Sequence, residues 1–323
     1  MQNNEELRRV ALTDVLTGLP NRRYFYQLLH GALAPGGTGP AVGAVLLIDL
    51  DNLKLINDSF GHSYGDEYIC IIAEKLAEAV CGHGVVARIG GDEFCVWLPE
   101  RSGEAVFALA DALLATLERW EKIGDQQLHV TASLGLALYP KDGRTAEELL
   151  QNADLALYDA KNAGKNTWRA YADVLQAATR ERLLLSNSLR HAVERAEMSL
   201  VYQPVVTPAG RITGFEALLR WNSPEHGAVS PAKFIPLAEQ GYLMKGLGKW
   251  VLQEASRFAQ ALRGLGRTDL QVHVNLSAQQ LEEASFVALV TEIVADAGIQ
   301  AGQIGLELTE SVLMESLDEA VDK

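Results

Sequence analysis

The stretch Arg88-Ile-Gly-Gly-Asp-Glu-Phe94 decides the fold of the first half of this chain. β-Prone residues lead into it from position 85 and out of it to position 98, which predicts a hairpin whose two-residue turn is Gly90-Gly91. Glycine supplies the positive φ that such a turn needs. Asp92 and Glu93 follow at once, and their alternation directs one carboxylate toward a metal and the other to the opposite face. Taken alone, the stretch also fits a polar hairpin tip without a function.

A second group of acids follows a run that is apolar throughout. Residues 41–48 predict a central strand covered on both faces, and Asp49-Leu-Asp51 come directly after it. Acids in this position either converge on a metal or simply terminate the strand. The chain then continues through a short helix, a turn and a helix over 68–80 before it reaches the hairpin.

The rest of the first half surrounds these two stretches. The expected elements are a turn over 14–20, a helix from an Asn21 cap to about 34, a helix over 102–120, a period-two strand over 128–138, a helix from a Thr145 cap to about 163, and a strand over 167–171. Lys161 and Lys165 stand at the end of the last helix, where interaction with the helix dipole is one explanation for them.

Length and composition limit the classes of function. The chain has 323 residues, enough for about two domains. Its net charge of −14 is unfavourable for binding nucleic acid or an anionic membrane. Cys70, Cys81 and Cys95 lack paired spacing, which indicates a reducing compartment rather than disulfides or zinc. No apolar run approaches the roughly 18 residues that span a bilayer, so we expect a cytoplasmic chain without membrane contact.

The second half follows a different pattern. Residues 173–197 predict a charged helix at the domain junction. Strands are then expected over 200–204, 214–221, 272–276 and 304–308, with helices from 231 and around 250 between them. Strands that alternate with helices in this way predict a parallel barrel or a doubly wound sheet.

The first half resembles the GGDEF domain of diguanylate cyclases. The resemblance rests on five ordered blocks, DVLTGLPNRR at 14–23, DLDNLKLIND at 49–58, GHSYGDE at 61–67, RIGGDEF at 88–94 and YDAKNAGKN at 158–166. It implies an α/β fold with a central, mainly antiparallel sheet flanked by helices, as in nucleotidyl cyclases.

The second half resembles an EAL domain, the phosphodiesterase of cyclic di-GMP. Its blocks are VYQP at 201–204, FEALLRW at 215–221, SPAKFIPLAE at 230–239, VNLSAQQL at 274–281 and LELTES at 306–311. This resemblance implies a TIM-type (β/α) barrel, of which a full copy needs about 250 residues. We therefore expect an incomplete, C-terminally truncated barrel without phosphodiesterase activity in this chain.

These resemblances imply a division of the chain and a set of site residues. The expected segments are the end of a linker helix at 1–13, a GGDEF domain at 14–172, a linker helix at 173–198 and the N-terminal part of an EAL domain at 199–323. The implied catalytic residues are Asp92, Glu93 and Lys54; the implied metal ligands are Asp49, the Leu50 carbonyl and Asp92; and the implied substrate-binding residues are Asn57, His62, Asp66, Lys161 and Lys165. In the second half, Glu216, Asn275 and Glu307 match metal ligands, while Gln203 and Arg220 match ligand contacts or serve as ordinary polar caps.

The resemblance implies the activity and its partners. A diguanylate cyclase uses Mg²⁺, or Mn²⁺, and joins two GTP molecules into cyclic di-GMP, so a homodimer in which each copy presents one GTP is expected. Two alternatives stay open: a phosphodiesterase whose first domain binds GTP as a regulator, and a non-catalytic receptor for cyclic di-GMP or GTP. Any membrane tether would come from an N-terminal sensor outside these 323 residues. The family's inhibitory RxxD sequence is replaced by Cys81-Gly-His-Gly84.

Overall fold

The computed structural model describes residues 11–34, 39–101, 103–123, 125–241, 243–281 and 283–308. The chain divides into two compact units, residues 1–179 and 180–323. The linker helix expected over 1–13 lies outside the described residues up to position 10. The elements of the first unit are α2 (Arg22–Ala32), β1 (Gly43–Leu50), α3 (Leu53–Phe60), α4 (His62–Val80), β2 (Val85–Gly90), β3 (Glu93–Pro99), α5 (Gly103–Leu117), β4 (Arg119–Ile123), β5 (Gln126–Val130), β6 (Ala132–Tyr139), α6 (Ala146–Asn162) and β7 (Trp168–Ala170).

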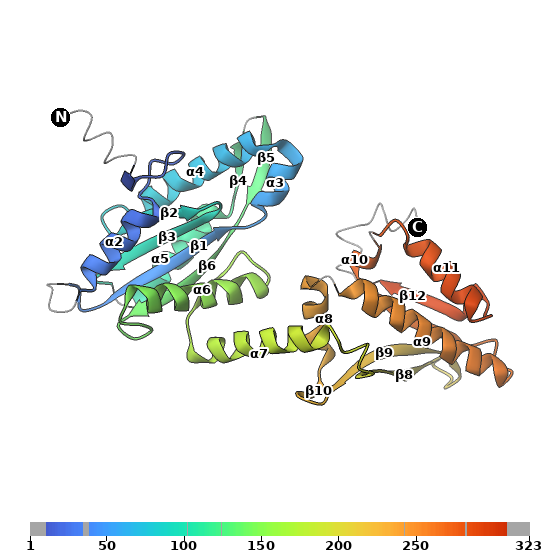
Figure 1. The fold of residues 1–323 in the computed structure, drawn as a ribbon. Helices are drawn as coiled ribbons and strands as arrows, with labels where there is room; N and C mark the ends of the chain where they lie inside the picture. The colour runs from blue at the N-terminus through green and yellow to red at the C-terminus, as the bar shows by residue number, and fades with distance from the viewer. Residues whose placement is uncertain are drawn as a thin grey trace. The chain divides into compact units, whose positions relative to one another are not determined.

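The first unit is a five-stranded sheet with helices on both faces (Figure 1). The strand order is β2-β3-β1-β6-β7, in which β1 pairs antiparallel with β3 and β6, and only β7 runs parallel to its neighbour. Helices α4 and α5 pack on one face, and α2 and α6 on the other. All eight residues of β1 are buried as a result. The predicted mainly antiparallel sheet flanked by helices is therefore confirmed.

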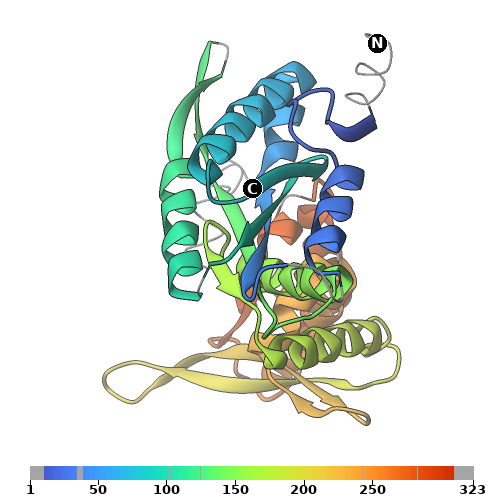
Figure 2. The ribbon, with the colours of Figure 1, turned by 90° about the vertical axis from the view of Figure 1, so that its left-hand side faces the viewer.

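Several local predictions are corrected by the structure. The hairpin turn consists of Gly91, with φ +37°, and Asp92, because Gly90 still belongs to β2. The pairing of β2 with β3 shifts between Arg88 and Gly90, and this irregularity moves the turn by one residue. The helix expected over 102–120 ends at Leu117, and the strand expected over 128–138 is divided between β5 and β6. Figure 2 shows the β4–β5 hairpin (green) that this division creates.

Arg88 anchors the segment that precedes α2 to the hairpin. Its Nη1 lies 3.0 Å from Asp14 Oδ1, its Nε and Nη2 donate to the Gly91 carbonyl, and its backbone N–H donates to the Pro20 carbonyl. Thr17 donates both its N–H and its hydroxyl to the same Asp14 carboxylate. Burial raises the pKa of Asp14, but the bonds from Thr17 and Arg88 outweigh it and hold the pKa below the usual value.

Replacing Asp14 with Asn should therefore destabilise the first unit by about 1–3 kcal/mol at pH 7, the range for hydrogen bonds to charged groups. A carboxyl whose pKa is lowered by folding stabilises the protein above its unfolded pKa, and that stabilisation is lost as the pH falls through the folded pKa. The difference between wild type and Asp14→Asn should shrink below about pH 4. Urea unfolding at both pH values tests this, with the exposed Glu74→Gln as control. A pH-independent difference would contradict it.

Helix α7 (Asp173–Leu189) contains the boundary between the two units, which falls after residue 179. The further elements of the second unit are β8 (Met198–Val206), β9 (Ile212–Ser223), β10 (Gly227–Val229), α8 (Pro231–Gln240), α9 (Met244–Gly264), β11 (Gln271–Leu276), α10 (Ala278–Leu281), α11 (Phe286–Asp296), η1 (Ala301–Gln303) and β12 (Ile304–Leu308). Strands β9, β11 and β12 run parallel, whereas β8 and β10 pair antiparallel with β9. The β8–β9 hairpin forms the long yellow ribbon in Figure 2.

The helices of the second unit cover one face of this sheet. Helices α9 and α11 pack with β11 and β12 around a core that contains Val272, Val274 and Leu276. Across the described residues, which end at 308, the strands form an open sheet with the parallel strand–helix pattern predicted for this half. The last three residues of the LELTES block lie outside the described residues. Within the described ranges, no helix is long and apolar enough to cross a membrane.

Candidate functional site

The register of β1 and β3 brings the acids of the first unit together. Asp49 pairs with Glu93, and the Leu50 N–H donates to the Asp92 carbonyl at 3.1 Å. The hairpin turn therefore lies beside the end of β1. An open pocket at this edge of the sheet is lined by Asp49, Leu50, Asp51, Asn52, Leu53, Lys54, Leu55, Asp58, Asp92, Lys161 and Lys165. Six of the residues named from the sequence thus share one pocket.

The end of α6 and the turn that follows it carry two lysines into this pocket. Lys161 Nζ lies 2.6 Å from Asp49 Oδ2, and Lys165 Nζ donates to Asn52 Oδ1 at 2.8 Å. Gly164, Lys165 and Asn166 all have positive φ, so the chain turns sharply back at the end of the helix. Lys161 lies in the last turn of α6, a position where a positive charge interacts favourably with the helix dipole. The same side chain contacts Asp49.

Asp51 has a different role from its neighbour Asp49. It is 5% exposed and accepts from the hydroxyls of Thr131 and Ser133, each at 2.9 Å, and from the backbone N–H of Asn166 at 3.1 Å. A carboxylate occupied by three donors fixes the loop that follows β1. Sequence reasoning did not find this function because its partners lie far away in the chain.

The carboxyl group of Asp49 has a pKa above its usual value. Burial raises its pKa, the contact with Lys161 opposes this, and the neighbouring Asp92 and Glu93 raise it further, so the net direction is upward. A divalent cation would relieve this repulsion. Within the described residues, no cluster of three His, Cys, Asp or Glu side chains forms a ready metal centre. The donor set that fits a hard cation is the Asp49 and Asp92 carboxylates with the Leu50 carbonyl, completed by phosphate oxygens.

Four other predicted residues lie outside this pocket. Asn57 Oδ1 is buried without a hydrogen-bond partner among the described residues, and it packs against Gly65, where an added Cβ would lie 2.0 Å away. This contact places Asn57 beside the turn of α4 that carries the exposed Asp66. His62 is exposed at the start of α4. Glu93 lines a separate hollow between α2 and α6, because it begins β3 instead of belonging to the turn.

Truncation of Asp51 should lower the free energy of unfolding much more than truncation of Asp49. Asp51→Ala leaves the buried Ser133 hydroxyl and the Asn166 N–H without their acceptor, so the free energy of unfolding should fall by about 3 kcal/mol or more. Asp49→Ala loses one ion pair but removes repulsion with Asp92 and Glu93, so its cost should stay within about 1 kcal/mol. Urea unfolding of the two variants compares them directly. Equal losses would show that Asp51 is not the structural carboxylate.

The second unit brings together the three predicted metal ligands. Asn275 Nδ2 donates to Glu216 Oε1 at 2.8 Å, and Asn275 is the register partner of Glu307 on β12. Because the amide nitrogen faces Glu216, its Oδ1 is left as a possible oxygen ligand. Glu216 lies within β9, near the end of its parallel pairing with β11, which finishes at Ala217 and Val274.

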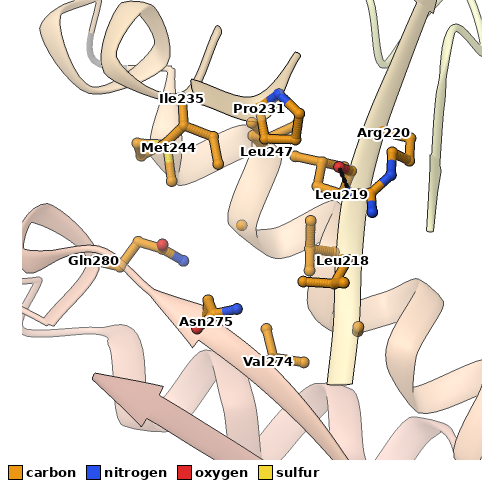
Figure 3. A pocket seen from close by; sticks show the side chains of 13 residues that line it. Leu218, Leu219, Arg220, Pro231, Ile235, Met244, Leu247, Val274, Asn275 and Gln280 are labelled. Atoms are coloured by element: carbon orange, nitrogen blue, oxygen red, sulfur yellow. Dashed lines mark hydrogen bonds between the residues drawn. The ribbon is translucent and has the colours of Figure 1, made fainter. Parts of the chain in front are cut away.

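A mainly apolar pocket lies beside these residues. Figure 3 shows Asn275 and Gln280 on one side of it and Leu218, Leu219 and Arg220 of β9 on the other. Arg220 lines this pocket, and its Nη1 donates to the Leu219 carbonyl at 2.8 Å. Gln203 is exposed on β8 opposite Glu216 and does not line this pocket.

The fold and sites define a two-unit protein. The first unit has the sheet and acid arrangement of a nucleotidyl-cyclase-like domain, and the second starts a strand–helix array with glutamates on the two strands that flank β11. The model of the family "Diguanylate cyclase, GGDEF domain" matches residues 11–167, and that of the EAL domain matches residues 186–323. The chain belongs to the proteins that carry a GGDEF domain followed by an EAL domain. Domains of both kinds generally use divalent metal ions.

Individual relatives support this assignment. The chain is 38% identical over 316 residues to the bifunctional diguanylate cyclase/cyclic di-GMP phosphodiesterase MucR of Pseudomonas aeruginosa, covering 98% of this chain and 46% of MucR. It is 35% identical over 312 residues to the cyclic di-GMP phosphodiesterase PdeR of Escherichia coli, covering 97% of this chain and 47% of PdeR. The chain thus spans less than half the length of these two relatives.

A solved structure supports the fold of both units. The S helix-GGDEF-EAL structure of Vibrio cholerae LapD, bound to c-di-GMP, aligns with a TM-score of 0.61 at 18% identity. The alignment covers 99% of this chain and 75% of the LapD chain. At this identity the likeness concerns the fold alone.

Proposed function

We propose that the first unit is a diguanylate cyclase that condenses two GTP molecules into cyclic di-GMP with release of two pyrophosphates. The observation that carries the proposal is the shared pocket of Asp49, Asp92, Lys54, Lys161 and Lys165 at the end of β1. Two carboxylates beside three ammonium groups match a metal–triphosphate ligand, since they offer oxygen donors and positive charge side by side.

The cation would be held by Asp49, Asp92 and the Leu50 carbonyl. When bound, Mg²⁺ or Mn²⁺ neutralises negative charge on the triphosphate. Lys161 now contacts Asp49, and phosphate oxygens would compete for its ammonium group. Asp92, on the turn, is the candidate acceptor for the proton of the attacking 3′-hydroxyl. Glu93 faces another hollow, so we assign it a supporting role through its charge near Asp49.

Asn57 and Asp66 would recognise the guanine. The Asn57 Oδ1 atom is buried and has no partner in the described part of the chain, which is costly unless a ligand supplies one. The exposed Asp66 carboxylate would accept from the guanine N1–H and amino group, while the Asn57 amide matches the other edge. His62 lies between them in the sequence, at the start of α4, and would border the base.

The product requires two copies of this unit. Cyclic di-GMP contains two 3′–5′ linkages, and a pocket that holds one GTP forms only half of the ring. A two-fold homodimer, in which each copy presents its GTP to the other, supplies both. We propose boundaries of 14–172 for the cyclase domain and 199–323 for the EAL part, with a linker at 173–198.

Asp92→Ala should abolish formation of cyclic di-GMP from GTP and Mg²⁺. The change removes the proposed metal ligand and proton acceptor from a half-buried position in a turn outside the core, so the fold should be retained. Product analysis by chromatography, at low and high protein concentration, measures the effect, and Asp154→Asn on α6 is the matched control because it lines the other hollow. Full turnover by Asp92→Ala, or no turnover by wild type at high concentration, would refute the cyclase proposal.

A cyclic di-GMP phosphodiesterase, with the first unit as a GTP-binding regulator, is the second candidate. It is favoured by the contact of Asn275 with Glu216 and the adjacent position of Glu307, which together offer oxygen donors to a divalent cation. Relatives named as phosphodiesterases, PdeR among them, support this candidate. Incubation of the purified 323-residue chain with cyclic di-GMP and Mg²⁺ or Mn²⁺, followed by analysis for linear pGpG, tests it.

Product inhibition beside the hairpin should be absent. Cys81 is exposed and Gly84 carries no side chain, so the chain offers neither a guanidinium nor a carboxylate at these positions. A Cβ at Gly84 would lie 2.1 Å from the Trp97 carbonyl oxygen, so an acid is not easily accommodated there. Calorimetric titration of residues 1–172 with cyclic di-GMP should show no micromolar site apart from the active site. A second micromolar site would contradict this expectation.

A further inference from the structure

His273 lies beneath the candidate metal ligands of the second unit. It precedes Asn275 by two residues on β11, so strand alternation places both side chains on the same face of the sheet. Val274, between them, points into the core under α9. In the parallel registers His273 pairs with Glu216 on β9 and with Gly305 on β12. The imidazole therefore stands between the strands that carry the two glutamates.

The imidazole contacts one of these glutamates directly. His273 Nδ1 lies 3.0 Å from Glu307 Oε1, with the His273 side chain 24% exposed. An ionised carboxylate offers only acceptor oxygens, so this contact favours the imidazole form that carries its hydrogen on Nδ1. Asn275 donates a hydrogen bond to Glu216 Oε1 at 2.8 Å. Strand β11 thus contacts both glutamates, one through an amide and the other through an imidazole.

The neighbouring strands leave room for this ring. A Cβ at Gly305 would lie 2.8 Å from His273 Nδ1, and a Cβ at Gly214 would lie 3.3 Å from His273 Nε2. Any other residue at Gly305 would press on the atom that donates to Glu307. The position of the imidazole is thus determined by the packing of three strands, unlike that of an exposed histidine on a loop.

We propose that His273 is a positioning residue for Glu307. Its Nδ1–H holds one carboxylate oxygen and leaves the other to a divalent cation shared with Glu216 and Asn275. The inference rests on the proposed metal ligands of the second unit and is independent of the cyclase. Hydrogen-bond donors that orient metal-bound carboxylates typically contribute about 10–100-fold to metal affinity.

The test is a titration of the full chain with Mn²⁺ alone, with free Mn²⁺ followed by electron paramagnetic resonance. All variants carry Asp49→Ala, which removes the site of the first unit. His273→Ala should weaken the remaining site about tenfold or more. His273→Asn should retain most of the affinity, since its amide N–H can take the place of Nδ1–H. His191→Ala is the control, because His191 forms an exposed 3.2 Å pair with Glu194 away from the ligands.

Two further variants make the outcome decisive. Gly305→Ala should displace the ring and weaken Mn²⁺ binding without removing any polar group, and thermal unfolding midpoints show whether each variant is folded. Undiminished Mn²⁺ affinity in His273→Ala and Gly305→Ala, with loss in Glu307→Gln, would overturn the positioning role and leave the metal ligands standing. Unchanged affinity in both Glu216→Gln and Glu307→Gln would overturn the metal ligands and the inference with them. Neither result bears on cyclic di-GMP synthesis.

Discussion

The antiparallel register of β1 with β3 is the constraint on which the first unit depends. Residues of β1 alternate between two cores, with Leu46 and Ile48 packed under α4 and α5, and Val45 and Leu47 packed under α2 and α6. A slip of one residue would exchange the two sets, so burial on both faces fixes the register. The same register sets the Leu50 N–H against the Asp92 carbonyl. The meeting of Asp49 with the hairpin acids Asp92 and Glu93 is therefore a consequence of how the core packs.

This arrangement concentrates negative charge at one sheet edge, and the chain manages it in two ways. The Asp51 carboxylate accepts hydrogen bonds from Thr131 and Ser133, around the start of β6, and from Asn166 in the turn after α6. These bonds stabilise the loop that follows β1. Asp49 keeps a raised pKa because it is buried near Asp92 and Glu93, with Lys161 as its counter-charge. Asp51 thus has a structural role, whereas the contact of Asp49 with Lys161 is one that a metal ion and a triphosphate could replace. Shifted pKa values such as that of Asp49 are common at functional sites.

Local patterns in the sequence were sufficient for much of the fold. The continuous apolar run of β1, the Asn21 cap of α2 and the capping box at Thr145 each predicted an element that the structure contains. The hairpin turn was misplaced by one residue because two adjacent glycines both permit it and the pairing irregularity decides between them. The partners of Asp51 lie 80 to 115 residues further along the chain, where no local pattern reveals them. Long-range contacts of this kind come from topology alone.

The two units differ in the side chains that contact their acidic residues. In the first, the contacts of the acidic site with Lys161 and Lys165 are charged and lie in an open pocket, so an incoming triphosphate can take these ammonium groups over. In the second, the glutamates are held by an amide and an imidazole from a strand buried on its other face. We expect these two contacts to stay in place when a cation binds, because outer hydrogen-bond partners orient the ligands of a metal. The first site is therefore built to exchange partners on binding its ligand, whereas the second is built to keep its ligand geometry before and after.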